Sequence, residues 1–168
     1  MNINKFTEKA REAVAGAQQL ADQMHHAQIE PEHLLVALVE QHEGIVPDLP
    51  RKMSADSAEV GRGARELLSK FPQAYGGSQA GLSPRLKLVT DAAENEAEHL
   101  KDEYVSTEHL FVATASETGR SPAAKFLQAQ GVTGDKISQA LKSVRGSQRV
   151  TTPNPEATYQ AQIGRAHV

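Results

Sequence analysis

Histidine is the residue type in this sequence with the widest chemical range, because imidazole binds metal ions and exchanges protons near neutral pH. The chain contains seven histidines, and four of them, at positions 25, 26, 33 and 42, lie close together in the sequence. No two of these four histidines have the i, i+4 spacing that places two zinc ligands on one helical face. We therefore interpret the histidines as surface or helix-capping residues and expect no metal site.

Two other kinds of chemistry are excluded by composition and motif. The chain has no cysteine, so it contains no disulfide, no thiolate zinc site and no thiol nucleophile. It also has no G-x-x-x-x-G-K-[ST] phosphate loop, and its glycine-rich stretch offers no lysine to a phosphate. We expect no catalytic residue and no cofactor, and we keep a small histidine-dependent metalloenzyme only as a contrasting hypothesis.

Two of the histidines belong to an internal repeat. With an offset of 76 positions, residues 6–40 align with residues 82–116, and Glu32-His33-Leu34 falls on Glu108-His109-Leu110. A catalytic role for these histidines needs two matching sites, whereas a repeated structural contact needs only the repeat. The structural interpretation is therefore favoured for both.

The apolar spacing predicts an all-α fold. In each repeat a hydroxyl residue, Thr7 or Ser83, precedes a long run of apolar positions three and four apart, as in an amphipathic helix. Three shorter helices follow the long one in each repeat, and the first of these three begins near Pro31 in the first repeat and near Thr107 in the second. We expect eight helices, arranged as two tandem four-helix repeats related by a pseudo-twofold axis.

The expected boundaries follow from the repeat and from the glycine-rich stretch. The first repeat spans residues 1–71, a connector spans 72–81, and the second repeat spans 82–146, with both repeats packed as one compact domain. Residues 147–161 are expected to form a flexible linker, and 162–168 read as a non-native tail.

Charge and hydropathy exclude two classes of partner. The formal charge of -3 comes from interspersed acidic and basic residues, so no basic surface for nucleic acid is expected. No apolar run approaches the about 18 residues that a membrane span requires, and the start lacks the apolar core of a signal peptide. We expect a soluble, cytoplasmic protein.

Several segments together resemble one known family. EPEHLLVAL, DEYVSTEHLFVA, the glycine-rich connector and PEATYQA closely resemble the amino-terminal domain of Clp ATPases, most specifically of the ClpB disaggregase, over about residues 1–161. The resemblance implies a monomeric domain at the front of a homohexameric, ATP-driven chaperone, which works with the DnaK system on unfolded or aggregated polypeptides. ATP binding and the ATPase module would then lie outside this chain, beyond the 147–161 linker.

The same resemblance implies a peptide-binding site. The polar contacts of the family fall here on Thr7, Asp102 and Glu108, beside an apolar groove that we expect to be lined by Phe6, Ala10, Leu86, Tyr104 and Val105. Such a groove would bind many unfolded segments weakly, through non-directional burial.

Structural interpretations of these residues remain open. Thr7 is explained equally well as a helix cap, Asp102 as part of a solvated loop, and Glu108 as a partner of the helix dipole, as Glu32 is in the first repeat. The alternative function is a stand-alone domain of this type that docks an adaptor or a Clp complex without binding client chains.

Overall fold

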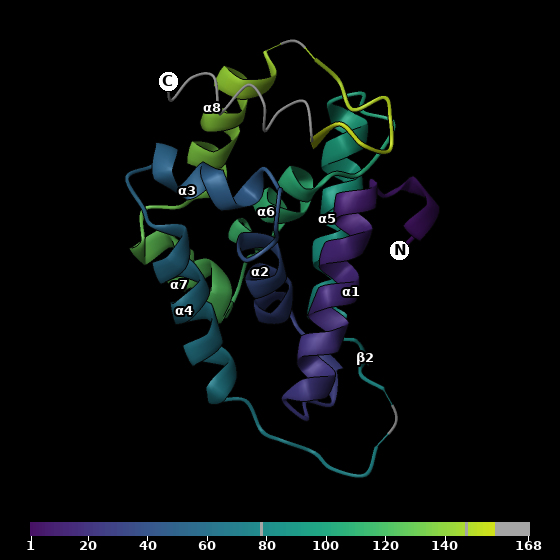
Figure 1. Cartoon of the computed structure of the whole chain (residues 1–168), viewed down its shortest axis with the longest axis vertical. Helices are drawn as coiled ribbons and strands as arrows, with labels where there is room; N and C mark the ends of the chain where they lie inside the picture. Colours follow the sequence, from purple (N-terminus) through teal and green to yellow (C-terminus); the bar gives the residue numbers. More distant parts are fainter. Residues whose placement is uncertain (78, 147, 157–168) are drawn as a thin grey trace.

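The computed structural model describes residues 1–77, 79–146 and 148–156. The tail expected at 162–168 and the part of the linker at 157–161 lie outside the described residues. Within them the fold is all-helical, with eight α-helices and one pair of two-residue strands, which confirms the expected fold class (Figure 1). The first repeat contains η1 (Ile3–Lys5), α1 (Glu8–Gln23), β1 (Gln28–Ile29), α2 (Pro31–Val39), η2 (Val46–Asp48), α3 (Leu49–Lys52) and α4 (Ser57–Ser69); the second contains β2 (Gly81–Leu82), α5 (Pro84–His99), α6 (Thr107–Ala115), α7 (Pro122–Ala129) and α8 (Gly134–Arg145).

The two long helices begin at the hydroxyl residues that the sequence indicates. The Thr7 Oγ1 accepts a hydrogen bond from the Ala10 amide at 3.1 Å, and the Ser83 Oγ accepts one from the Leu86 amide at 3.0 Å. Each bond satisfies an amide of the first turn that has no partner within the helix. Pro84 occupies the first position of α5, where its missing N–H is not needed.

The repeated histidines are capping residues. The Glu30 amide donates to Nδ1 of His33, and the Ser106 amide donates to Nδ1 of His109, both at 2.8 Å. Because Nδ1 accepts, the ring proton of each neutral histidine lies on Nε2. Burial, and then the neighbouring imidazole of His26, lower the pKa of His33 to about 4, so this ring is neutral at physiological pH.

The repeats interlock through two short crossed pairings. Phe6, at the start of the first repeat, forms a parallel bridge with Val105 of the second, and the Thr7 amide donates to the Val105 carbonyl at 2.9 Å. The same contact recurs 76 positions along the chain, where Leu82 pairs with Ile29. The segment before each long helix therefore binds to the other repeat, and the two repeats form one domain.

Helices α2 and α6 form the centre of the core. Both are buried on nearly all sides, and α2 contacts α1 and α4 of its own repeat and α5, α6 and α7 of the other. An apolar surface all round is typical of a helix enclosed by others. Close packing also explains Gly63, since a Cβ at this position would lie 2.2 Å from the ring of Phe126 on α7.

The third helix of the first repeat is short. Pro50 is the second residue of α3, a first-turn position that tolerates proline, and the preceding turn is the 3-10 helix η2. The connector leaves α4 and runs along one end of the molecule to β2 (Figure 1). Neither feature changes the central pair α2 and α6.

One arginine joins the repeats electrostatically. Arg85 of α5 reaches Glu30 at 3.1 Å, Glu32 at 2.9 Å and Glu117 at 2.8 Å. The Glu32 side chain has no exposed surface and also accepts from the Ala123 amide at the start of α7, at 3.0 Å. Glu32 is thus a fully paired buried carboxylate, beyond its expected role with the helix dipole.

Loss of Arg85 is expected to destabilise the domain strongly. In Arg85→Met the Glu32 carboxylate stays buried without its counter-charge, and the free energy of unfolding should fall by about 3 kcal/mol. Arg65→Met is the matched control, because Arg65 pairs with Glu40 at the surface and its loss should change stability by less than about 1 kcal/mol. Urea unfolding of both variants measures this; equal midpoints would contradict the proposed role of Arg85.

Candidate functional site

The three polar residues expected to contact a peptide lie in one region of the structure. Thr7 precedes α1, Asp102 lies in the loop before α6, and Glu108 is in the first turn of α6. Arg145, the last residue of α8, contacts both Asp102 at 2.7 Å and Glu108 at 3.4 Å. As peptide contacts these three residues remain a prediction, but their proximity is a structural fact.

Asp102 is a buried structural hub rather than part of a solvated loop. Its Oδ1 accepts from Nη2 of Arg145 and from the Val150 amide, each at 2.7 Å, and its Oδ2 accepts from Nε2 of His109 at 2.8 Å. Burial alone would raise the pKa of Asp102, but the hydrogen bonds from His109, Arg145 and Val150 outweigh it and lower the pKa to about 2. The side chain is ionised at any physiological pH.

Glu108 is the counterpart of Glu32 but is much less completely paired. Its side chain is 1% exposed, and its one ion pair, with Nη1 of Arg145, spans 3.4 Å. Within the part of the chain that the structure describes, neither carboxylate oxygen has a hydrogen-bond partner. A buried carboxylate with unused acceptor capacity is a candidate binding group, because buried polar atoms are nearly always paired.

An open groove of about 390 Å³ lies beside Glu108, between the end of α5, helix α6 and helix α8. Its apolar wall includes Leu100, Val112 and Leu141, and Glu108 contributes to its lining. Leu100 is 44% exposed, so its apolar surface is accessible to a bound segment. We call this the α5/α6/α8 groove.

The apolar groove expected from the resemblance is not open in this conformation. Four of its five expected lining residues belong to the core, with exposed fractions of 0%, 0%, 2% and 3% for Phe6, Ala10, Leu86 and Val105. Phe6 and Val105 form the bridge between the repeats, and Ala10 and Leu86 lie on the inward faces of α1 and α5. Tyr104 is half-buried.

The residues after α8 depart from the expectation of a flexible linker. Residues 148–156, which we call the strap, lie against the domain, with Val150 and Glu156 fully buried. Oε1 of Glu156 accepts from the Thr7 hydroxyl at 2.6 Å, while Pro153 accepts from the Glu8 amide at 2.8 Å. The strap therefore covers Thr7 and Asp102.

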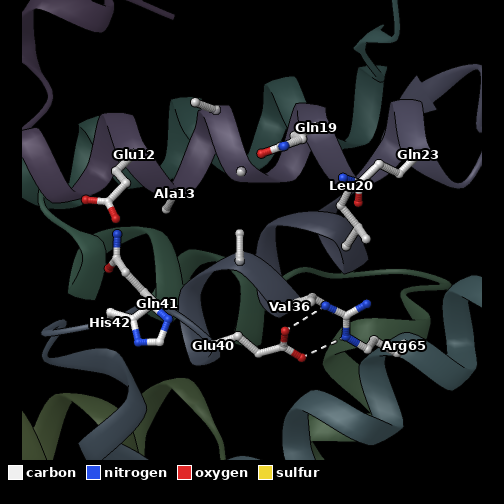
Figure 2. A pocket seen from close by; sticks show the side chains of 13 residues that line it. Glu12, Ala13, Gln19, Leu20, Gln23, Val36, Glu40, Gln41, His42 and Arg65 are labelled. Carbon is white, nitrogen blue, oxygen red and sulfur yellow. Dashed lines mark hydrogen bonds and ion pairs between the residues drawn. The ribbon is translucent and has the colours of Figure 1, made fainter.

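A second groove lies between α1 and α2 (Figure 2). It is larger, about 520 Å³, but its carboxylates are exposed and paired: Glu40 with Arg65 at 2.7 Å, and Glu12 with Lys9 at 3.4 Å. Since it contains no buried unpaired carboxylate among the described residues, it is the weaker candidate.

The described residues contain neither a metal-binding cluster nor a membrane-spanning helix. In residues 1–77, 79–146 and 148–156, no group of three histidine, aspartate or glutamate side chains is placed to hold a metal ion. No helix in the same ranges has the length and apolar character to span a bilayer.

The buried charge of Asp102 should make stability depend on pH. Because its pKa is lowered from 3.8 to about 2, its contribution of about 2 kcal/mol is present above pH 4 and is lost as pH falls toward 2. Asp102→Asn should therefore lower the free energy of unfolding at pH 7, and the difference from wild type should narrow in acid. Urea unfolding at several pH values, with the exposed Glu98→Gln as control, tests this; a difference independent of pH would instead indicate a packing effect.

Comparison with known proteins agrees with this architecture. The family described as Clp repeat (R) N-terminal domain matches residues 5–130. The chaperone protein ClpB of Bacillus cereus is 38% identical over 165 residues, which cover 96% of this chain and 19% of the relative. The chain thus spans about a fifth of the length of this curated relative.

Solved structures share the fold. The Hsp104 N-terminal domain from Candida albicans superposes with a TM-score of 0.78 and 23% identity, over 90% of this chain and 99% of that one. A complex of the ClpV N-domain with a VipB peptide has a TM-score of 0.66 and 15% identity, over 83% and 86% of the two chains. With the interlocked helical repeats, the family match over residues 5–130 shows that the chain belongs to the Clp repeat N-terminal domain family.

Proposed function

We propose that this domain binds extended apolar segments of unfolded or aggregated polypeptides in the α5/α6/α8 groove. The observation that carries the proposal is the combination of an open apolar wall with a buried, incompletely paired carboxylate, Glu108. Leu100, Val112 and Leu141 supply burial without directional demands, so many sequences are accepted. Glu108 supplies an acceptor for a backbone amide or a basic side chain.

The size of the groove sets the expected strength of binding. A groove of about 390 Å³ holds a few side chains and is open to solvent. The free energy gained by burial in the groove therefore exceeds the cost of lost translational and conformational freedom only slightly. Binding is accordingly weak and tolerant of sequence. Such binding suits a first capture step rather than a permanent complex.

The proposal extends to the larger protein to which such a domain belongs. The ClpB relatives are named chaperones and are about five times as long as this chain. We propose that the domain delivers captured segments to an ATP-driven hexamer, in the cytoplasm and with the DnaK system. ATP would bind outside this chain.

Docking of a defined partner peptide is the second candidate. It is favoured by the ClpV N-domain, which shares this fold and whose solved structure contains a VipB peptide. A partner peptide and a client segment present the same chemistry to an apolar groove, so selectivity distinguishes the two functions.

A charge in the groove should weaken capture. Leu100→Glu should weaken the binding of a fluorescent, permanently unfolded client by at least about tenfold, because an apolar contact is lost and a charge must be desolvated. Leu88→Glu is the matched control: Leu88 is on the same helix, is 68% exposed and does not line the groove, so the variant should bind like wild type. Fluorescence anisotropy titration measures both dissociation constants.

Two other results would change the conclusion. Equal affinities of Leu100→Glu and wild type would remove the groove as the binding site. Failure of the wild type to bind several unrelated unfolded clients, together with binding of a single defined partner peptide, would replace client capture by partner docking.

A further inference from the structure

Four of the hydrogen bonds that hold the strap are made by Thr7, Glu8, Asp102 and Glu103, and others join Gln148 to Arg145 and Glu156 to the Thr107 amide. The Val150 amide donates to Asp102 and the Glu103 amide donates to the Val150 carbonyl, both at 2.7 Å. Further along, the Pro153 carbonyl accepts from the Glu8 amide at 2.8 Å, and Glu156 accepts from the Thr7 hydroxyl at 2.6 Å. The domain thus provides a surface that binds a chain segment whose residues 148–155 are neither helix nor strand; we call this surface the strap seat.

Three of these four bonds involve the backbone of the strap and do not depend on its side chains. Recognition through backbone groups, with pockets for a few side chains, is the way extended peptides are commonly bound. The buried side chains of the strap include Val150, Pro155 and Glu156, whereas residues 151–154 are exposed. A segment with a β-branched residue, a proline five positions later and a hydrogen-bond acceptor directly after that proline matches this pattern.

The seat is filled imperfectly by its present occupant. Oε2 of Glu156, Oγ1 of Thr107 and both carboxylate oxygens of Glu108 are buried and lack hydrogen-bond partners among the described residues. Burial, opposed by the bond from Thr7, raises the pKa of Glu156, and the nearby charge of Glu108 raises it further. A second carboxylate beside Glu108 lowers the stability of the closed strap, so the strap can be displaced.

The strap also borders the proposed binding groove. Gln148 and Arg149, at its start, line the α5/α6/α8 groove together with Leu100 and Glu108. A bound segment that extends along the groove past Glu108 therefore meets the strap. The groove and the strap seat are parts of one continuous surface.

We infer that the strap is an internal ligand, and that a client segment with a β-branched apolar residue, a proline five positions later and a hydrogen-bond acceptor directly after it displaces the strap from the strap seat. This inference rests on the proposed function for the identity of the displacing chain. Occupation by the strap lowers the apparent affinity for clients by the fraction of molecules in which the seat is open.

Two substitutions at Glu156 should act in opposite directions. Glu156→Ala removes the acceptor for Thr7 and should open the seat, which tightens client binding by about tenfold, the change expected from one buried hydrogen bond to a charged group. Glu156→Gln keeps an acceptor for Thr7 and removes the like charge beside Glu108, so it should close the strap and weaken client binding. A purely structural role of Glu156 does not predict opposite signs.

The experiment uses the full chain and two fluorescent probes. One probe is a permanently unfolded client, and the other is an end-capped peptide with the sequence of residues 148–156. Both are titrated into wild type, Glu156→Ala, Glu156→Gln and Thr151→Ala, the last being an exposed strap position that should bind like wild type. Urea unfolding of each variant establishes that the domain remains folded.

The outcomes separate this inference from the proposed function. Tighter binding of both probes by Glu156→Ala, weaker binding by Glu156→Gln, and competition between the probes support the inference. Client binding that is equal in all four proteins overturns the internal ligand and leaves client capture standing. Binding of the strap peptide to Glu156→Ala without any client binding supports the internal ligand and overturns client capture.

Discussion

The structure depends on how two buried glutamates are paired at the starts of its two central helices. Helices α2 and α6 are enclosed by the other helices, and each carries a glutamate, Glu32 or Glu108, in its first turn with no exposed surface. A buried carboxylate without partners destabilises a fold by several kcal/mol, so each needs donors from elsewhere in the chain. The source of those donors determines what each half of the domain does.

In the first repeat the donors come from the protein itself. Arg85 and the amide of Ala123 bind Glu32, and both belong to the second repeat, so the same contacts pair the charge and hold the repeats together. In the second repeat Arg145 is committed to Asp102 at 2.7 Å and reaches Glu108 only at 3.4 Å. The duplicated scaffold thus has one glutamate serving stability and an equivalent glutamate left available at an open groove. The strap, which places Glu156 beside it, partly covers this region without pairing it.

Local features of the fold could be predicted from the sequence, and long-range contacts could not. The caps at Thr7 and Ser83, the helix starts at Pro31 and Thr107, and the repeat itself are encoded in adjacent residues, so spacing alone indicates them. The burial of Phe6 and Val105 could not be predicted from local sequence, because it arises from a bridge between residues that are far apart in the chain. The packing of Val150 and Glu156 could not be predicted either, because a polar, proline-containing composition is typical of a flexible linker. Arg145 gave no signal except its position at a helix end, where a basic residue is ordinary.

The central claim is that the second repeat, on the side of Glu108, is where an extended chain binds. The most direct measurement is the mapping of amide chemical shifts by NMR as an unfolded polypeptide is added to the isotopically labelled chain. The account predicts changes at Leu100 and Val112 in the groove and at Glu8 and Glu103, whose amides are released when the strap leaves. Changes confined to Gly16, Gln19 and Ala37, in the groove between α1 and α2, would contradict it.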